Sequence, residues 1–279
     1  MVPDRLLRLF YQAASGNRPS RTIGQISDIA LPRRVLDRLI RSYCRVFRIS
    51  LADAEVPVGG FRTFDAFFTR KLKPGARLID LDPAAVASPC DGHVQSAGRV
   101  ERGMVLQAKG HEYAIADLLG DQDLCARFDG GTYVTVYLSP RDYHRVHFPL
   151  DGDVVSCRYA PGRLYTVAPR AVKVVEALFP RNERITTELR TGFGTVAVVM
   201  VGAVGVGRIT VTCGGMSSNT GRDRGRVAFD PPIPCRKGEE MGVFHLGSTV
   251  VMLLEPGDWS IVPSQGAAVR MGEALIQKT

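Results

Sequence analysis

The sequence predicts a mainly β (α+β) protein, in which a β-sheet domain follows amphipathic N-terminal helices. The 279 residues include 29 glycines and 17 prolines, a content typical of turn-rich folds. Residues 132–138 (TYVTVYL) alternate with the two-residue period of a strand, whereas residues 33–49 repeat with the period of a helix. We therefore expect helical residues 1–60 and β-rich residues 61–279. A hydrophobic content of 45% excludes a wholly disordered chain.

Residues 33–49 form an amphipathic pattern with two distinct sides. At about 100° per residue, five arginines fall within an arc of about 80°, and aliphatic and aromatic residues fill the other side. The apolar side holds Leu36, Leu39, Ile40, Tyr43, Val46 and Phe47. Two interpretations remain open: a surface helix packed on its own domain, or a helix lying in a membrane surface. Residues 6–11 suggest a second short helix of the same kind.

Positive charge is concentrated at the N-terminal end. Residues 1–80 contain 15 basic and 7 acidic residues, while the remainder of the chain is neutral overall. Nucleic acid and anionic lipid are both candidate partners for such a region. The strongly apolar opposite side of the helix favours lipid, so we expect no nucleic-acid partner.

The β-rich part begins after an aromatic and basic segment. In residues 61–73, Phe64, Phe67 and Phe68 have helical spacing and predict a core-facing turn. Further strands are expected at residues 195–201, 209–212 and 248–255. Residues 191–207 carry no charge, but their valines and glycines favour two buried strands joined by a turn over a transmembrane helix.

The six cysteines are scattered and none forms a C-x-x-C pair, which argues against a zinc site. We expect them to be reduced and structural, as in a cytoplasmic protein. Residues 1–10 contain no run long enough for a signal-peptide core. No metal ion is expected.

Four residue positions combine the types needed for hydroxyl chemistry. Asp91 lies in a predicted turn, His144 and His147 stand three apart in a loop or helical turn, and Ser248 follows Gly247 before an apolar strand. Spacing of three places both imidazoles on one side of a helical turn. Each residue alone also fits a structural role. Together, an aspartate, a histidine and a serine can form a hydroxyl-activating triad.

Seven ordered blocks between about residues 61 and 255 resemble the phosphatidylserine decarboxylase family. The last block alone is a weak signal, but the ordered set is strong. The blocks are FFTRKLKPG (67–75), SPCDG (88–92), LSPRDYHRVHFP (138–149), PGRLYTV (161–167), FPRNER (179–184), KGEE (237–240) and LGST (246–249). The chain departs from the common family pattern at Thr166, where serine is frequent, and at Phe148, where methionine is frequent.

The resemblance implies a self-processing, pyruvoyl-dependent carboxy-lyase. Asp91, His147 and Ser248 match the family's self-processing triad, in which the serine oxygen attacks the carbonyl of Gly247. The resulting ester would break by β-elimination, giving a β chain (1–247), an α chain (248–279) and a pyruvoyl group derived from Ser248. The substrate amine would then form a Schiff base with this group, and CO₂ would leave.

His144 matches the family residue assigned to decarboxylation, and Thr166 and Thr249 are expected to contact substrate. The resemblance also implies that phosphatidylserine in a membrane is the substrate and phosphatidylethanolamine the product. It favours the membrane-docking interpretation of residues 33–49, with peripheral attachment to the cytoplasmic face of the cell membrane. A homodimer of processed protomers is implied as well. The alternative is a non-processing, membrane-surface β-domain without catalytic activity.

Overall fold

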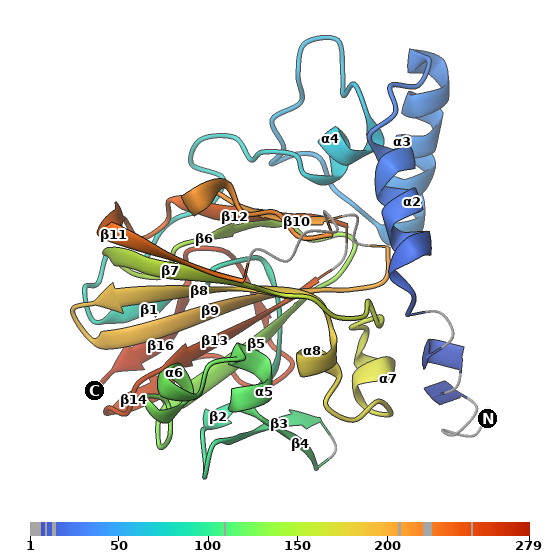
Figure 1. The fold of residues 1–279 in the computed structure, drawn as a ribbon. Coiled ribbons are helices and arrows are strands. Elements are labelled where there is room, and N and C mark those ends of the chain that lie inside the picture. Colours follow the sequence, from blue (N-terminus) through green and yellow to red (C-terminus); the bar gives the residue numbers. More distant parts are fainter. Residues whose placement is uncertain are drawn as a thin grey trace.

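The computed structural model describes residues 7–8, 10–12, 15–108, 110–205, 208–219, 225–246 and 248–279. Its architecture is mainly β, as the sequence predicts, with antiparallel sheets and a few helices. Helices α2 and α3 stand at one end of the sheets, and short helices cover one face of the largest sheet (Figure 1).

An eight-stranded antiparallel sheet forms the centre of the fold. From edge to edge its strands are β11 (Arg226–Cys235), β7 (Gly152–Ala160), β8 (Arg184–Thr191), β9 (Gly194–Gly202), β13 (Ser248–Leu254), β5 (Thr132–Leu138), β2 (Gly92–Arg99) and β15 (Ala268–Val269). The predicted strands at residues 132–138 and 248–255 are therefore confirmed. Strand β13 lies in the interior of this sheet, between β9 and β5.

Three smaller sheets complete the β-structure. One contains β1 (Ala85–Ala87), β16 (Ala274–Lys278) and β14 (Trp259–Ile261); another contains β10 (Arg208–Val211), β12 (Glu240–His245) and β6 (Arg145–His147); a third pairs β3 (Met104–Ala108) with β4 (His111–Ala114). The sheet of β10, β12 and β6 matters most for function, because β12 leads directly into the segment before β13.

The helices are mostly short. They are α2 (Asn17–Ser27), α3 (Arg33–Phe47), α4 (Phe64–Phe68), α5 (Ile115–Leu119), α6 (Gln122–Ala126), α7 (Pro169–Val172), α8 (Leu178–Arg181) and the 3₁₀ turn η1 (Cys213–Gly215). Within the described ranges, no helix is both long enough and apolar enough to span a membrane.

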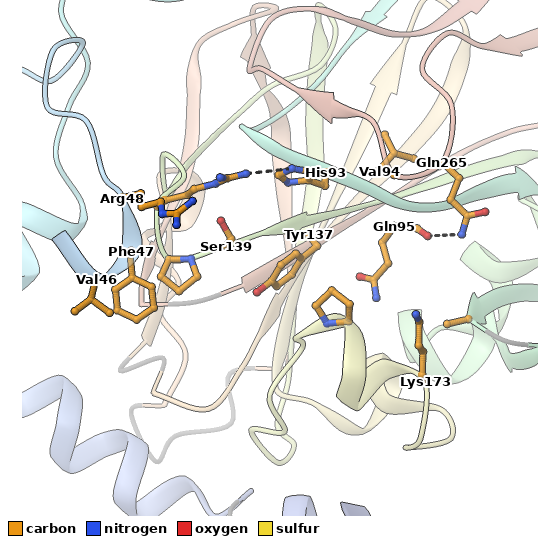
Figure 2. A pocket seen from close by; sticks show the side chains of 15 residues that line it. Val46, Phe47, Arg48, His93, Val94, Gln95, Tyr137, Ser139, Lys173 and Gln265 are labelled. Carbon is orange, nitrogen blue, oxygen red and sulfur yellow. Dashed lines mark hydrogen bonds between the residues drawn. The ribbon is translucent and has the colours of Figure 1, made fainter. Parts of the chain in front are cut away.

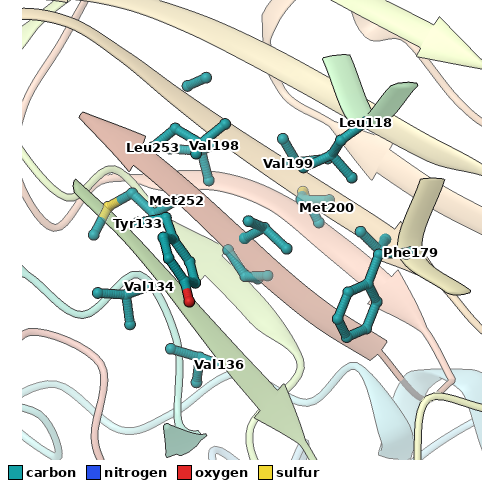
Figure 3. Close-up of a cluster of buried hydrophobic side chains, with 14 of the residues drawn as sticks. Leu118, Tyr133, Val134, Val136, Phe179, Val198, Val199, Met200, Met252 and Leu253 are labelled. Atoms are coloured by element: carbon teal, nitrogen blue, oxygen red, sulfur yellow. The ribbon is translucent and has the colours of Figure 1, made fainter. Parts of the chain in front are cut away.

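The main core lies on both faces of the large sheet, with the short helices over one face and the smaller sheets contributing to the same cluster. All seven residues of β13 are buried, and so are eight of the nine residues of β9. β-branched residues suit such fully covered strands, because their stiff side chains pack well on a pleated surface. Figure 3 shows part of this cluster, with side chains of β9, β13 and β5 together with Leu118 and Phe179 from the short helices.

A second apolar cluster joins α3 to α4. Leu36 and Ile40 of α3 pack with Phe67 and Phe68 of α4, and all four are buried. The predicted core role of the phenylalanines is thus confirmed. Thr63 caps α4 by accepting a hydrogen bond from the backbone N–H of Ala66. The expected domain boundary at residue 60 stays a prediction.

Residues 191–207 were expected to form two strands, but they contain only one complete strand, β9. The preceding strand β8 ends at Thr191, and β10 begins at Arg208. All six cysteines are free. Of the short helix expected at residues 6–11, residues 6 and 9 lie outside the described residues, and the others are helical.

Candidate functional site

Ser248 begins the central strand of the large sheet. It pairs with Leu138 of β5 on one side and with Gly202 of β9 on the other. Its side chain is 0% exposed, and its Oγ has no hydrogen-bond partner within the described residues. A buried hydroxyl without a partner is unfavourable, by about 1–3 kcal/mol. Such a group is therefore more typical of a reactive site than of a structural one.

The residue two positions before Ser248 has an unusual backbone conformation. Leu246 has a φ of 88°, in the left-handed region that favours glycine. For a leucine this conformation costs about 1–3 kcal/mol and persists only when its surroundings hold it. Gly247, the predicted cleavage residue, lies outside the described residues. Strain is thus present immediately before the predicted cleavage point.

Asp91 is held rigidly at the start of β2. Its Oδ1 accepts hydrogen bonds from Arg77 Nε and from the backbone N–H of Met271, both at 2.9 Å, and its Oδ2 accepts from Arg77 Nη2. The neighbouring Gly92 permits this placement, since a Cβ there would lie 2.4 Å from the carbonyl oxygen of Tyr137. The predicted turn aspartate is therefore a buried, fully hydrogen-bonded carboxylate.

His147 ends β6 and is a neutral imidazole with a defined tautomer. Its Nδ1 lies 2.8 Å from the carbonyl oxygen of Gly238, which can only accept, so Nδ1 carries the proton. The other nitrogen, Nε2, accepts from the hydroxyl of Tyr143 at 3.1 Å. Burial lowers the pKa of His147, and the carbonyl of Gly238 and the charges of Glu240 and Asp91 partly offset this effect. The nitrogen that carries the lone pair is the one a base would use.

His144 is the more deeply buried of the two histidines. Its ring is 0% exposed and packs on Phe68, with ring centroids 4.1 Å apart. Its Nδ1 donates to the carbonyl of Asp142 at 2.8 Å, while Nε2 has no partner within the described part of the chain. Burial, helped by the charge of Arg70, lowers the pKa of His144 to about 3. His144 thus offers an unprotonated, unoccupied nitrogen at neutral pH.

The structure only partly gathers the predicted residues. The two histidines belong to a strand and its entry rather than to a helical turn, and their rings have different partners, so the expectation that they share a side is not supported. The carbonyl of His144 accepts from the N–H of Phe244, close to Ser248 in the chain, whereas His147 lies opposite Glu240 at the other end of β12. In the described ranges, no hydrogen bond links Asp91, His147 and Ser248. The triad stays a prediction.

Arg70 is a site residue that the sequence did not single out. Its side chain is largely buried, and burial lowers its pKa. Nη2 donates to the carbonyls of Arg141 and Asp142, and the guanidinium lies 5.6 Å from the ring centroid of Phe67. Nη1 has no hydrogen-bond partner among the described residues. The only sequence signal was its place in the FFTRKLKPG block.

A cavity of about 830 Å³ is lined by residues at the start of β2 and the end of β5, the strand next to β13. Thr249, Tyr137 and His93 form one row across β13, β5 and β2, and the last two line the cavity. Figure 2 shows Tyr137 and His93 on the sheet side of this cavity and Val46 and Phe47, from the end of α3, at another part of its wall. The lining is mostly apolar, with Arg48, Arg141 and Lys173 among its polar members. The hydroxyl of Thr249 is buried and has no partner within the described residues.

Thr166 lies apart from this cavity, where its hydroxyl accepts from the N–H of Ala168 at 3.4 Å. Tyr165, the residue before Thr166, is connected through the fully buried Asn182 to Gly202 of β9, which pairs with Ser248. The Asn182 amide donates to the carbonyls of Tyr165 and Gly202, and its oxygen accepts from the N–H of Tyr165. Asn182 is a second residue that sequence reasoning missed, although it lies in the FPRNER block. The substrate-binding role of Thr166 stays a prediction.

Among the described residues, no group of three or more His, Cys, Asp or Glu side chains is placed to hold a metal ion. The chemistry available here is that of buried hydroxyl, imidazole, carboxylate and guanidinium groups.

Comparison with known proteins agrees with this combination of fold and site. A family model described as phosphatidylserine decarboxylase matches residues 64–277. A phosphatidylserine decarboxylase proenzyme from Anaeromyxobacter sp. (strain K) is 43% identical over 277 residues, which cover 98% of each chain. Proenzymes of the same name from Bordetella pertussis and Pseudomonas aeruginosa are 40% and 44% identical, over 98% and 86% of this chain and 94% and 86% of their own.

These matches place the chain among the decarboxylases. More specifically, the chain belongs to the phosphatidylserine decarboxylase family. The resemblance drawn from the seven sequence blocks is thereby confirmed.

Proposed function

We propose that this chain cleaves itself between Gly247 and Ser248 and then converts phosphatidylserine to phosphatidylethanolamine and CO₂ as a pyruvoyl-dependent carboxy-lyase. One observation carries the proposal: Ser248 Oγ is fully buried and lacks a hydrogen-bond partner within the described chain, two residues after the strained Leu246. The proenzyme names of the relatives agree with a precursor that must be processed.

In the first step His147 acts as the base. Its Nε2 carries the lone pair and accepts a hydrogen bond from the Tyr143 hydroxyl. If the Ser248 hydroxyl replaced that of Tyr143 as the donor, Nε2 could take the serine proton. Burial lowers the pKa of His147, and the charges of Glu240 and Asp91 partly offset this effect and so favour the form that holds the serine proton. The Ser248 oxygen then bonds to the carbonyl carbon of Gly247, the C–N bond breaks, and the proton passes to the nitrogen.

The peptide has then become an ester, and elimination completes the cut. Loss of the Cα proton of Ser248 breaks its Cβ–Oγ bond, which leaves Gly247 with a free carboxylate and residue 248 as an enamine. Water converts this terminus to a pyruvoyl group and releases ammonia. Oxidants and reductants play no part in this sequence, because only water enters and only ammonia leaves.

The unpartnered hydroxyl of Ser248 fits the formation of this group, since no structural hydrogen bond within the described residues must be broken. The pyruvoyl group supplies an electron sink for the loss of CO₂. His144 Nε2 is free to position the departing carboxylate or to carry a proton to the product carbon. A bound anionic head group would raise the pKa of His144 and so assist the second role.

The cavity beside Thr249 suits a phospholipid. Its apolar lining matches acyl chains, and Arg48, Arg141 and Lys173 provide positive charge for a phosphate. Val46 and Phe47 belong both to the cavity wall and to α3. We infer that lipid enters the cavity from the side of α3.

Helix α3 also has the surface needed for membrane attachment. Leu36 and Ile40 are buried, but Val35, Leu39 and Val46 are 53%, 43% and 72% exposed. At about 100° per residue, these three lie within about 40° of one another, between the buried side and the arginines. We call them the docking surface and propose that they enter the membrane interface while the arginines contact anionic head groups. Peripheral attachment at the cytoplasmic face and a homodimer of processed protomers belong to the same proposal.

The test is a denaturing intact mass of the purified protein beside a Ser248→Ala control. We expect two chains, residues 1–247 and 248–279, with the shorter chain lighter by one ammonia than simple hydrolysis predicts. The control should remain whole. A single 279-residue chain in both samples would overturn the proposal and favour the alternative, a membrane-surface domain without catalysis.

A further inference from the structure

Two consecutive residues before the proposed cleavage point, His245 and Leu246, are both held by α4. Asp65 of α4 binds the side chain of His245: its Oδ1 and Oδ2 lie 2.8 Å and 3.0 Å from His245 Nδ1. The two side chains are only 11% and 13% exposed. Leu246 packs against the buried cluster that contains Phe67 and Phe68 of the same helix.

Both α4 and His245 have further contacts that fix their positions. The Thr63 cap begins the helix, and Phe67 and Phe68 bury it against α3. His245 is fixed in addition by its pairing with Arg208 across β12 and β10, and Thr210 Oγ1 lies 3.2 Å from its Nε2. A short helix thus connects the N-terminal helices to the end of β12.

We propose that α4 is a clamp that keeps Leu246 in its left-handed conformation, which makes Asp65 a positioning residue for self-cleavage. This inference rests on the self-cleavage proposed above. Ser248 is fixed in β13 by neighbours on both sides, so the direction in which the chain enters residue 247 depends on Leu246. Relaxation of Leu246 to negative φ would change the direction of the backbone that leads toward Ser248. The clamp opposes that relaxation.

The first experiment compares self-cleavage rates of freshly synthesised precursor. Asp65→Ala should slow cleavage by at least about tenfold, within the range that the strain at one residue represents. Asp28→Ala is the matched control, because Asp28 binds Arg208 in the same polar cluster at 2.9 Å and makes no contact with His245. This control should cleave at the wild-type rate.

The second experiment separates clamping from general structural support. Glycine adopts positive φ at no steric cost, so Leu246→Gly should cleave faster than Leu246→Ala, although both lose the packing on α4. In the Leu246→Gly background, Asp65→Ala should slow cleavage by no more than about threefold. A merely structural role for Asp65 would leave its full effect in both backgrounds.

The outcomes distinguish this inference from the function on which it rests. If wild-type precursor does not cleave, the proposed function fails. If wild type cleaves and Asp65→Ala cleaves equally fast, or Leu246→Gly is no faster than Leu246→Ala, only the clamp is wrong. Melting temperatures of the same variants in a Ser248→Ala background show whether each precursor is folded.

Discussion

The guanidinium of Arg77 covers the whole carboxylate of Asp91, with Nε on Oδ1 at 2.9 Å and Nη2 on Oδ2 at 2.5 Å. Both side chains are only 10% exposed. Removal of Arg77 would leave the carboxylate of Asp91 uncompensated in a poorly solvated place, whereas Arg77 would keep a second partner in Asp53 at 3.0 Å. The pair therefore orients the proposed triad carboxylate and fixes the start of β2.

Arg77→Met should destabilise the precursor by about 3–5 kcal/mol, the usual cost of breaking a buried ion pair from one side. Urea unfolding in the Ser248→Ala background measures the change. Arg190→Met is the matched control, since the Arg190–Asp153 pair is 62% and 40% exposed and should contribute about 1 kcal/mol or less. Equal losses for the two variants would contradict the role of burial.

The buried imidazole of His144 should make stability depend on pH. Folded His144 stays neutral down to a pKa of about 3, whereas in the unfolded chain it gains a proton below about pH 6.5. The unfolded state thus binds more protons between these values, so stability is full above about pH 6.5 and falls as the pH falls. From pH 6.5 to 5 the loss should approach about 2 kcal/mol.

His144→Gln should remove that part of the pH dependence, as measured by urea unfolding of uncleaved precursor at several pH values. His111→Gln, at the partly exposed start of β4, is the matched control. An unchanged slope in the His144 variant would show that other groups cause the acid sensitivity.

Substitution of His147 should block self-cleavage, whereas substitution of His144 should block decarboxylation. His147→Ala should leave the chain whole, because the proposed base for Ser248 is missing. His144→Ala should still cleave but lose CO₂ release by at least about a hundredfold, the usual contribution of one acid–base group. Gel analysis of cleavage and a radiometric CO₂ assay separate the two effects. An uncleaved His144→Ala that is folded would reverse the assignment.

Membrane binding should depend on the docking surface. Val46→Glu places a charge where a 72% exposed valine would enter the interface, and it should weaken binding to phosphatidylserine vesicles by about tenfold. Leu81→Glu is the control, because Leu81 is 88% exposed but lines a different hollow, with Phe193 and Lys237, in which no residue of α3 takes part. Co-sedimentation measures both. Equal weakening by the two variants would remove α3 from the docking role.

Local patterns predicted much of the fold. The alternation in β5 and the helical repeat of α3 are strong because each depends on neighbours in the sequence. Ordered motifs carried the family membership. The two-strand interpretation of residues 191–207 was wrong because β8 ends at Thr191, the first residue of the uncharged segment, and β10 begins at Arg208, just beyond its end. No hydrophobic period marks these boundaries.

The site could be predicted only as a set of residue types. The partners of those residues come from distant segments: Arg77 reaches Asp91, Gly238 accepts from His147, and Asp65 lies 180 residues before His245. Such contacts depend on topology, which a single sequence does not display. The exposed part of α3 shows the same limit, since its pattern predicted the apolar side but not which part of that side the domain would cover.

The place of β13 determines how the mature protein would come apart. Residues 248–279 would form a separate chain, yet β13 is paired along its full length with β9 and β5, and β16 is paired with β1. The short chain could then leave only if the central sheet opened. Refolding would become a bimolecular event, dependent on protein concentration, whereas the precursor refolds as one molecule. The precursor would unfold and refold reversibly, whereas the lifetime of the cleaved protein would depend on how fast it unfolds.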